Sequence, residues 1–327
     1  MAHDMKLGRF GLPILAAVLI GTAQFAPARA ADGKTDPGDM IGNSSGGGFV
    51  VGEEFSEPLG YEADLSAKTE LIAAFDRYMA GEISLEEFRS IEAAAGDELG
   101  EPTRMEVEQF TPEARAKRLK GFARAQMLGE PCGPDTVPCD VVQMKLAVTH
   151  VAQSNNFYCG PASGTMVAKF LNAPTSRYNG VALTQVNMAS SVHMRTHVDN
   201  ATNWADNDWT FGINRWMRGT STGTGYYVQI PSPSTSRFRQ ALRYDILDKH
   251  PFGISTVEWQ GETSYNGHNT STQTVGHWLT AFGFTESLDR TWFKDPASSV
   301  WAGTQPSIDR PTNTFVNAWL DTNGISA

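Results

Sequence analysis

Residues 153–162 read Gln-Ser-Asn-Asn-Phe-Tyr-Cys-Gly-Pro-Ala, and the ten residues that follow have the apolar spacing of a helix. Pro161 suits the first turn of that helix, which we expect to run to Leu171. Cys159 is thereby placed at the mouth of the helix, where the helix dipole favours thiolate over thiol. The stretch predicts a nucleophilic cysteine whose partners come from the rest of the fold.

Two residues further along the chain could complete a catalytic set. His277 opens an apolar strand that would hold its ring rigidly, and Asp295 ends the next predicted strand. Adjacent strands can bring Asp295 to the far nitrogen of His277, where a carboxylate orients the imidazole. Gln153 and the backbone N–H of Cys159 can donate hydrogen bonds to an oxyanion. The predicted catalytic residues are therefore Cys159, His277, Asp295 and Gln153.

The order of helices and strands predicts an α+β fold, in which a nucleophile helix precedes a sheet that carries the histidine and the aspartate. Strands are expected at 252–259, 278–285 and 291–294, a β-rich apolar segment at 141–151, and helices near 183–193, 209–217 and 237–250. Residues 141–327 are predicted to form one domain, because about 190 residues are enough for one hydrophobic core.

The first sixty residues predict export followed by a linker. Residues 1–30 combine a basic start, a short apolar stretch and an Ala28-Arg29-Ala30 cleavage site, which is the pattern of a signal peptide. The apolar stretch is too short to span a bilayer comfortably, so we expect a secreted bacterial protein without stable membrane insertion. Residues 31–60 contain a Ser/Gly-rich run and are predicted to be a flexible linker.

Residues 61–130 predict an acidic helical region. Residues 31–110 carry 19 acidic and 5 basic residues, whereas the rest of the chain is nearly neutral. Two helices, the second starting at a capping box at Ser84, are expected before a third at 111–128. The residues expected to face inward are Leu71, Ile72, Phe75 and Met79, then Leu85, Phe88 and Ile91. The region is either a propeptide that restrains the enzyme until its removal or a subdomain that is retained.

The chain has three cysteines, and export to an oxidising compartment suggests that two of them pair. Cys132 and Cys139 lie close together in a segment rich in turn formers, which predicts a small disulfide loop. Two reduced surface thiols are the alternative. Cys159 then stays unpaired, as a nucleophile must be.

Each catalytic assignment has a competitor. Cys132 also begins a Cys-Gly-Pro triplet, but the residues after it do not start a helix. His150 and His268 compete with His277 as the base, and we expect His268 to lie in a poorly fixed loop. Asp289 is a second candidate for the carboxylate. A buried cysteine, a hydrogen-bonded histidine and a turn aspartate are the structural alternatives to the three catalytic roles.

Two groups of polar residues have part of the pattern of a metal site. His193 and His197 are four residues apart, as in a helical zinc pair, but no third ligand is evident. The oxygen-rich segment 199–208 lacks the spacing and the central glycine of an EF-hand, and calcium binding there stays open. Our prediction contains no metal and no cofactor. A net charge of −10 without a basic patch also argues against nucleic acid as a partner.

The ordered set of motifs resembles the C39-like branch of the papain-like cysteine peptidases. The matching pieces are Gln153, residues 158–163, Gly276-His277-Trp278 with Phe282-Gly283, and Asp295-Pro296. The resemblance covers roughly 145–300 and implies a papain-like fold, in which the nucleophile helix packs on an antiparallel sheet carrying His and Asp. It also implies hydrolysis of peptide bonds by a Cys–His–Asp triad. The Cys-Gly-Ser/Ala-Cys-Trp/Tyr signature of papain and the cathepsins is absent.

The sequence therefore predicts a secreted cysteine peptidase that acts on peptide or protein substrates. An acyltransferase or transpeptidase on the same fold is an alternative, because a triad alone does not choose the acceptor of the acyl group. A non-catalytic peptide-binding module that retains the fold is the other alternative.

Overall fold

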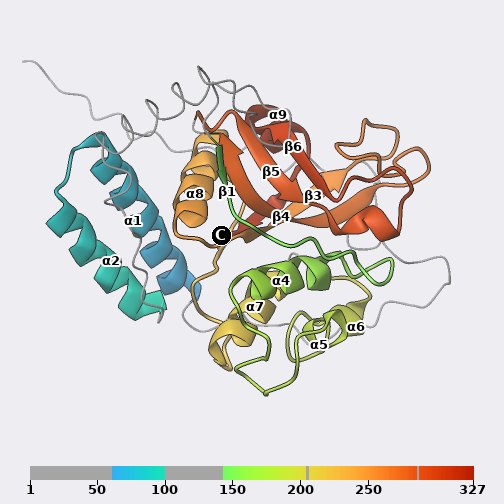
Figure 1. Ribbon diagram of the computed structural model, residues 1–327, viewed down its shortest axis with the longest axis horizontal. Coiled ribbons are helices and arrows are strands. Elements are labelled where there is room, and N and C mark those ends of the chain that lie inside the picture. Colours follow the sequence, from blue (N-terminus) through green and yellow to red (C-terminus); the bar gives the residue numbers. More distant parts are fainter. Residues whose placement is uncertain (1–60, 100–142, 204–205, 286) are drawn as a thin grey trace, which may run out of the picture. The chain divides into compact units, whose positions relative to one another are not determined.

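The structure is a computed structural model that describes residues 61–99, 143–203, 206–285 and 287–327 (Figure 1). The predicted signal peptide, the linker, the third helix at 111–128 and the cysteines Cys132 and Cys139 lie outside these residues. The described part of the chain has an α+β fold, as predicted. No helix within it is long and apolar enough to cross a membrane.

One seven-stranded antiparallel sheet organises the described residues. Its strands are β1 Gln143–Lys145, β2 Gln229–Ile230, β3 Phe252–Glu258, β4 Val275–Thr285, β5 Arg290–Lys294, β6 Ser307–Pro311 and β7 Leu320–Ser326. The strand order is β2-β7-β3-β4-β5-β6, and β1 pairs with the end of β4. The predicted strands at 252–259, 278–285 and 291–294 are confirmed as β3, β4 and β5, whereas β2, β6 and β7 have no counterpart in the predictions.

Helices precede and surround the sheet. They are α1 Tyr61–Ala80, α2 Leu85–Leu99, α4 Cys159–Phe170, α5 Gln185–Met188, α6 Thr196–Asp199, α7 Asp208–Arg218, α8 Thr235–Leu247 and α9 Thr312–Ala318, with a 3₁₀ turn η3 Pro296–Ser299. The predicted helices near 209–217 and 237–250 are confirmed as α7 and α8, and the predicted nucleophile helix is confirmed as α4.

The apolar segment 141–151 forms less strand than its composition suggests. Only Gln143–Lys145 pairs in a ladder with β4, and the backbone N–H of Leu146 adds one more bond to the carbonyl of Phe282 at 2.8 Å. After Leu146 the polypeptide leaves the sheet and runs towards the loop that follows β5. His150 Nε2 lies 2.8 Å from the carbonyl of Asp295. This departure brings residues 150–153 beside the end of β5.

The central strand β4 is buried along its whole length because helices cover both faces of the sheet. Neighbouring residues of β5 show the two layers, since successive side chains of a strand point to opposite faces. Trp292 clusters with Met166 of α4. Phe293 stacks on Phe315 of α9, with ring centroids 4.2 Å apart. The site described below forms where α4 meets this sheet.

Buried hydroxyls fix α4 against β4. Ser163 Oγ donates to the carbonyl of Leu279 at 3.1 Å and lies 2.8 Å from Thr280 Oγ1. Cys159 precedes Ser163 by about one helical turn, and His277 precedes Thr280 by about 10 Å of strand. These bonds therefore set the position of α4 along β4 and with it the meeting of Cys159 and His277.

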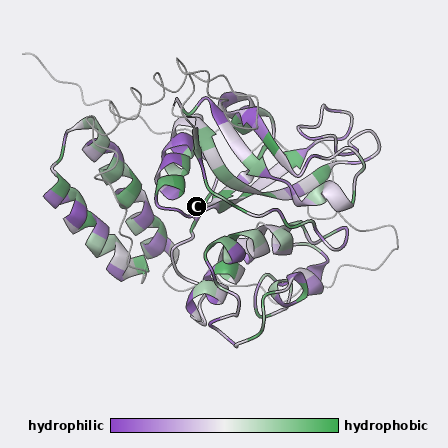
Figure 2. Cartoon of the chain, viewed as in Figure 1, coloured by the Kyte–Doolittle hydropathy of each residue, from purple (hydrophilic) through white to green (hydrophobic). Residues whose placement is uncertain are grey.

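Helices α1 and α2 are amphipathic, and in Figure 2 hydrophobic and hydrophilic residues interchange along both of them. Leu71, Ile72, Phe75 and Phe88 are buried as predicted, while Met79 and Ile91 are partly buried. Ser84 Oγ accepts from the backbone N–H of Glu87 at 3.1 Å, which confirms the cap. The prediction was wrong for Leu85, which is 36% exposed, because α1 has already ended opposite the first turn of α2.

Helix α1 is attached to α8 by a buried ion pair, which we call the docking pair. Lys68 Nζ lies 2.5 Å from Asp245 Oδ1, and neither side chain is exposed. The hydroxyl of Tyr226 donates to the same carboxylate oxygen at 2.8 Å, and Lys68 Nζ lies 3.4 Å from the centre of the Tyr226 ring. Asp64 of α1 also accepts from the backbone N–H of Gly225 at 2.7 Å.

Candidate active site

Cys159 is the first residue of α4, so its thiol lies at the N-terminal end of the helix. The residue is 5% exposed, and it is unpaired. The next residue, Gly160, has no room for a side chain. A Cβ atom at Gly160 would lie 2.1 Å from Thr202 Oγ1, so a larger residue would push away the segment that precedes α7. Close approach at Gly160 thus fixes Thr202 over the start of α4.

His277 in β4 lies between Asp295 and Cys159. Its Nε2 lies 2.9 Å from Asp295 Oδ1, and Cys159 lies close enough to the ring to raise its pKa. Burial alone would lower the pKa of His277, but the charge and hydrogen bond of Asp295 and the contact with Cys159 outweigh it and raise the pKa to about 10. The structure therefore brings the predicted nucleophile, base and carboxylate together, with the imidazole protonated at neutral pH.

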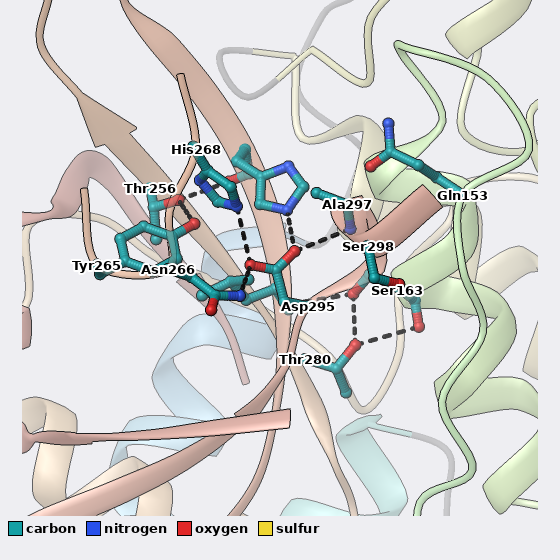
Figure 3. Close-up of polar contacts among 12 residues, drawn as sticks. Gln153, Ser163, Thr256, Tyr265, Asn266, His268, Thr280, Asp295, Ala297 and Ser298 are labelled. Carbon is teal, nitrogen blue, oxygen red and sulfur yellow. Dashed lines mark hydrogen bonds and ion pairs between the residues drawn. The ribbon is translucent and has the colours of Figure 1, made fainter. Parts of the chain in front are cut away.

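The carboxylate of Asp295 accepts four hydrogen bonds. Oδ1 accepts from His277 Nε2 and from the backbone N–H of Ala297, both at 2.9 Å. Oδ2 lies 2.9 Å from His268 Nε2 and 2.7 Å from Asn266 Nδ2 (Figure 3). Burial would raise the pKa of Asp295, but the attraction of His277 and these hydrogen bonds hold it well below its usual range. Asp295 is a fixed anion with all its acceptor positions filled.

Gln153 is held beside the site by its backbone. Its N–H donates to the carbonyl of Pro296 at 2.9 Å, and its carbonyl accepts from Ser299 Oγ at 2.5 Å. The side chain of Gln185 holds the two residues that flank Gln153: its Nε2 donates to the carbonyl of Ala152, and its Oε1 accepts from the N–H of Ser154. This bracing fixes the residue that the sequence predicts as an oxyanion donor.

The Gln153 side chain uses one of its two amide hydrogens inside the loop. Nε2 donates to the carbonyl of Asn155 at 2.8 Å, while Oε1 is buried and has no hydrogen-bond partner. A second N–H therefore remains on Nε2 for another acceptor. The backbone bonds of Gln153 to Pro296 and Ser299 place the residue at the turn that follows Asp295. This remaining N–H is the one that the prediction assigns to an oxyanion.

His268 corrects a prediction, because it is not in a poorly fixed loop. Its side chain is completely buried, with Nε2 on Asp295 and Nδ1 in a short contact with Glu258 Oε2. Burial opposes the charged ring, but the two carboxylates outweigh it and raise the pKa of His268. We call the residues His277, Asp295, His268 and Glu258 the carboxylate–imidazole chain.

One feature of the sequence could have indicated the missed pair. Glu258 ends the apolar strand β3, and an ionisable side chain that is buried there needs a charged or hydrogen-bonding partner. The partner, His268, comes ten residues later. Asn266, two residues before His268, was not among the predicted site residues. Its bond to Asp295 joins segments that are distant in sequence, so no local pattern indicates it.

The other rival residues have different surroundings. His150 bonds the backbone carbonyl of Asp295, and burial lowers the pKa of its ring. The side chain of Asp289 is 69% exposed and lies 3.3 Å from Arg239, so it takes no part in the site. His193 and His197 have separate partners: His193 bonds Ser176 and Ser190, and His197 makes a short contact with the Tyr158 hydroxyl.

Oxygen atoms of the 199–208 segment are engaged in its own turns. Asp208 Oδ2 accepts from the backbone N–H of Asn203 at 3.0 Å, and Asp206 Oδ2 accepts from Asn203 Nδ2 at 2.8 Å. Elsewhere among the described residues, His268, His277 and Asp295 have potential ligand atoms within 4.8 Å of one another. These atoms are bonded to one another, which favours proton chemistry over metal binding.

Trp301 packs against the two imidazoles. Its ring centroid lies 4.8 Å from that of His268 and 6.1 Å from that of His277. An indole at this position excludes water from the hydrogen bonds to Asp295 and lowers the local dielectric constant, which strengthens them. The site thus combines a helix-terminal thiol, a protonated imidazole, a fixed carboxylate and an amide donor.

Residues 145–327 match the family model described as the peptidase C39-like family. No curated protein sequence matches the chain. The matched stretch contains all four residues of the candidate site.

Proposed function

The chain belongs to the peptidase C39-like family, and we propose that it is a secreted cysteine peptidase that hydrolyses peptide bonds with Cys159 as nucleophile. His277 acts as acid and base, Asp295 orients it, and Gln153 donates to the oxyanion. The observation that carries the proposal is the position of His277, which bonds Asp295 and lies close enough to Cys159 for the thiol to raise its pKa in a buried site.

Attack begins from a thiolate–imidazolium pair. Cys159 Sγ forms a bond to the scissile carbonyl carbon, and the carbonyl π electrons move to the oxygen. The helix dipole of α4 and the charge of His277 favour the thiolate before attack. Asp295 keeps the imidazolium in place because its Oδ1 bonds Nε2 at 2.9 Å. It does not take the proton, since its own pKa is held low.

The oxyanion accepts from the backbone N–H of Cys159 and from Gln153 Nε2. As the C–N bond breaks, His277 gives its proton to the leaving amine and becomes neutral. Water then attacks the acyl-enzyme while His277 takes a proton from it. The C–S bond then breaks, which releases the carboxylic acid product and the thiolate, and the thiolate–imidazolium pair is restored.

The same reasoning extends to the fold and to the destination of the protein. A nucleophile helix that packs on an antiparallel sheet carrying the histidine and aspartate supports a papain-like arrangement for residues 141–327. The basic start, the short apolar stretch and the Ala28-Arg29-Ala30 site support secretion.

The test is intact-mass labelling of the mature protein with an irreversible thiol-directed peptidase inhibitor. We expect one adduct on the wild type, none on Cys159→Ala and much slower labelling of His277→Ala. His193→Gln is the matched control, because His193 is also buried and hydrogen-bonded but belongs to another cluster. A wild-type thiol that reacts no faster than a model thiol would overturn the proposal. Added amine acceptors separate hydrolysis from acyl transfer.

A further inference from the structure

The carboxylate–imidazole chain extends beyond the three residues that a Cys–His–Asp site requires. His277 bonds Asp295, Asp295 bonds His268, and His268 bonds Glu258. The side chains of Asp295, His268 and Glu258 are completely unexposed, and that of His277 is 1% exposed. Two carboxylates and two imidazoles therefore alternate in a medium that penalises any unpaired charge.

The partners of His268 determine its protonation. Both ring nitrogens face carboxylate oxygens, Nδ1 facing Glu258 Oε2 and Nε2 facing Asp295 Oδ2. Ionised carboxylates only accept hydrogen bonds, so both nitrogens have to donate and the ring is an imidazolium. The raised pKa of His268 agrees with this. The ring is thus a second cation in the site, with its centroid 5.0 Å from that of His277.

The loop between β3 and β4 is built to hold this cation. Glu258 Oε1 accepts from the backbone N–H of Tyr265 at 2.7 Å. Ser264 Oγ accepts from the backbone N–H groups of Asn266 at 3.0 Å and of His268 at 2.8 Å. Asn266 then reaches Asp295 beside His268, as Figure 3 shows. The loop therefore delivers two donors to the Asp295 oxygen that does not contact His277.

We propose that His268 is a positioning residue of the candidate site: held as a cation by Glu258, it keeps Asp295 ionised and oriented and favours the thiolate of Cys159. The proposal rests on the proposed function, because it assigns a role to His268 in activating that thiol. His268 itself touches no reacting atom and acts through Asp295 and through its charge.

The electrostatic consequence has a definite sign. Removing a buried cation makes every neighbouring group hold its proton more tightly, and Glu258 is left as an uncompensated anion that acts in the same direction. The charged groups that act on His268 are Glu258, Asp295 and His277. Tyr265 packs on its ring, with centroids 5.0 Å apart, and Cys159 and Arg310 interact electrostatically with Tyr265. At the 5.0 Å between the two ring centroids of His268 and His277 and an effective dielectric constant of about 20, Coulomb's law gives a shift of about two pH units at His277. Cys159 is not a direct partner of His268, so we expect a smaller shift, of about one pH unit, in the acid limb.

The experiment is the pH dependence of Cys159 alkylation and of kcat/KM in His268→Gln, with the full mature chain. We expect the acid limb of both profiles to move to higher pH by about one unit, so that the rate below the limb falls about tenfold and recovers on the alkaline side. A merely structural role would lower the rate at all pH values without moving the limb. His193→Gln, another buried histidine, should leave the limb in place.

A second measurement does not depend on how the variant folds. Nitrogen NMR of histidine-labelled wild-type protein should show one ring, besides that of His277, with both nitrogens protonated at neutral pH. An unprotonated nitrogen on His268 would overturn the proposal, as would an unshifted acid limb in folded His268→Gln. If the wild-type thiol itself is not activated, the proposed function fails instead, so the two failures are distinguishable.

Discussion

Two buried clusters of charge can be compared in this protein, the docking pair between α1 and α8 and the carboxylate–imidazole chain at the candidate site. In the docking pair one ammonium, Lys68, meets one carboxylate, Asp245, with the Tyr226 hydroxyl beside them. In the carboxylate–imidazole chain, imidazoles provide the cations and each carboxylate has several donors. Both clusters are unexposed, so burial alone does not distinguish them.

The difference lies in whether protons can move. Burial raises the pKa of Asp245 even though Lys68 opposes this shift, which marks the docking pair as costly to desolvate. Asp295 has the opposite shift, because two imidazoles and two N–H donors surround it. The His277 ring is linked both to Asp295 and to the thiol of Cys159, so its proton can be transferred during a reaction, whereas Lys68 is paired with Asp245 and stacked on Tyr226. The docking pair therefore attaches a helix, and the carboxylate–imidazole chain is suited to proton transfer at its His277 end.

The largest expected effect comes from replacing Cys159 or His277, at the reactive end of the carboxylate–imidazole chain. Cys159→Ser or His277→Ala should lower kcat for peptide hydrolysis by about 10⁴-fold or more, because the nucleophile and base act as a unit. The thermal midpoint of Cys159→Ser should change little, since the oxygen replaces sulfur in the same place. Peptide hydrolysis is measured beside circular dichroism. Wild-type turnover by folded Cys159→Ser would contradict the assignment.

Breaking the docking pair should affect stability instead of chemistry. Lys68→Met leaves Asp245 buried without its cation, and we expect the free energy of unfolding to fall by about 3–5 kcal/mol. Replacing both residues, as Lys68→Met with Asp245→Leu, should recover most of that loss, because the desolvation cost of both charges disappears. Urea unfolding gives the energies.

The exposed ion pair of Arg77 and Glu87 is the matched control for the docking pair. It also involves α1, at 3.5 Å and with both side chains about half exposed, and Arg77→Met should cost at most about 1 kcal/mol. Labelling of Cys159 should stay at the wild-type rate in folded Lys68→Met. Faster labelling would instead support the prediction that residues 61–130 restrain the enzyme.

The oxyanion donor should have an intermediate effect. Gln153→Ala removes one of two donors, and we expect kcat to fall by about 10²–10³. Gln229→Ala is the control, because this buried glutamine of β2 also donates to a backbone carbonyl, that of Asn323 at 3.0 Å. An equal loss in both variants would mean that the amide of Gln153 serves packing.

The pH dependence should show the raised pKa of His277. The leaving amine needs a proton from this ring, so kcat/KM should fall as the pH approaches 10 and the ring deprotonates. The same shift stabilises the folded state below the ordinary pKa of histidine, about 6.5, and this stabilisation is lost as the pH rises towards 10. In Asp295→Asn the alkaline limb should move to lower pH. An unmoved limb would separate Asp295 from the titration of His277.

Local features of the sequence determined much of the fold. The helix that begins at Cys159, the strand that holds His277 and the strand before Asp295 could be predicted because each depends on neighbouring residues: Pro161 in a first helical turn, apolar runs and turn formers. The cap at Ser84 was predictable for the same reason. The order of Gln153, Cys159, His277 and Asp295 indicated the chemistry before any distance was known.

Only the tertiary structure decided which polar residues are buried together. Lys68 and Asp245 are 177 residues apart, and Asn266 reaches Asp295 across 29 residues. His268 lies in a polar loop, so its burial could not be predicted from its neighbours. The physical reason is that a buried charge is tolerated only where a partner is present, and in this protein the partners come from distant parts of the chain.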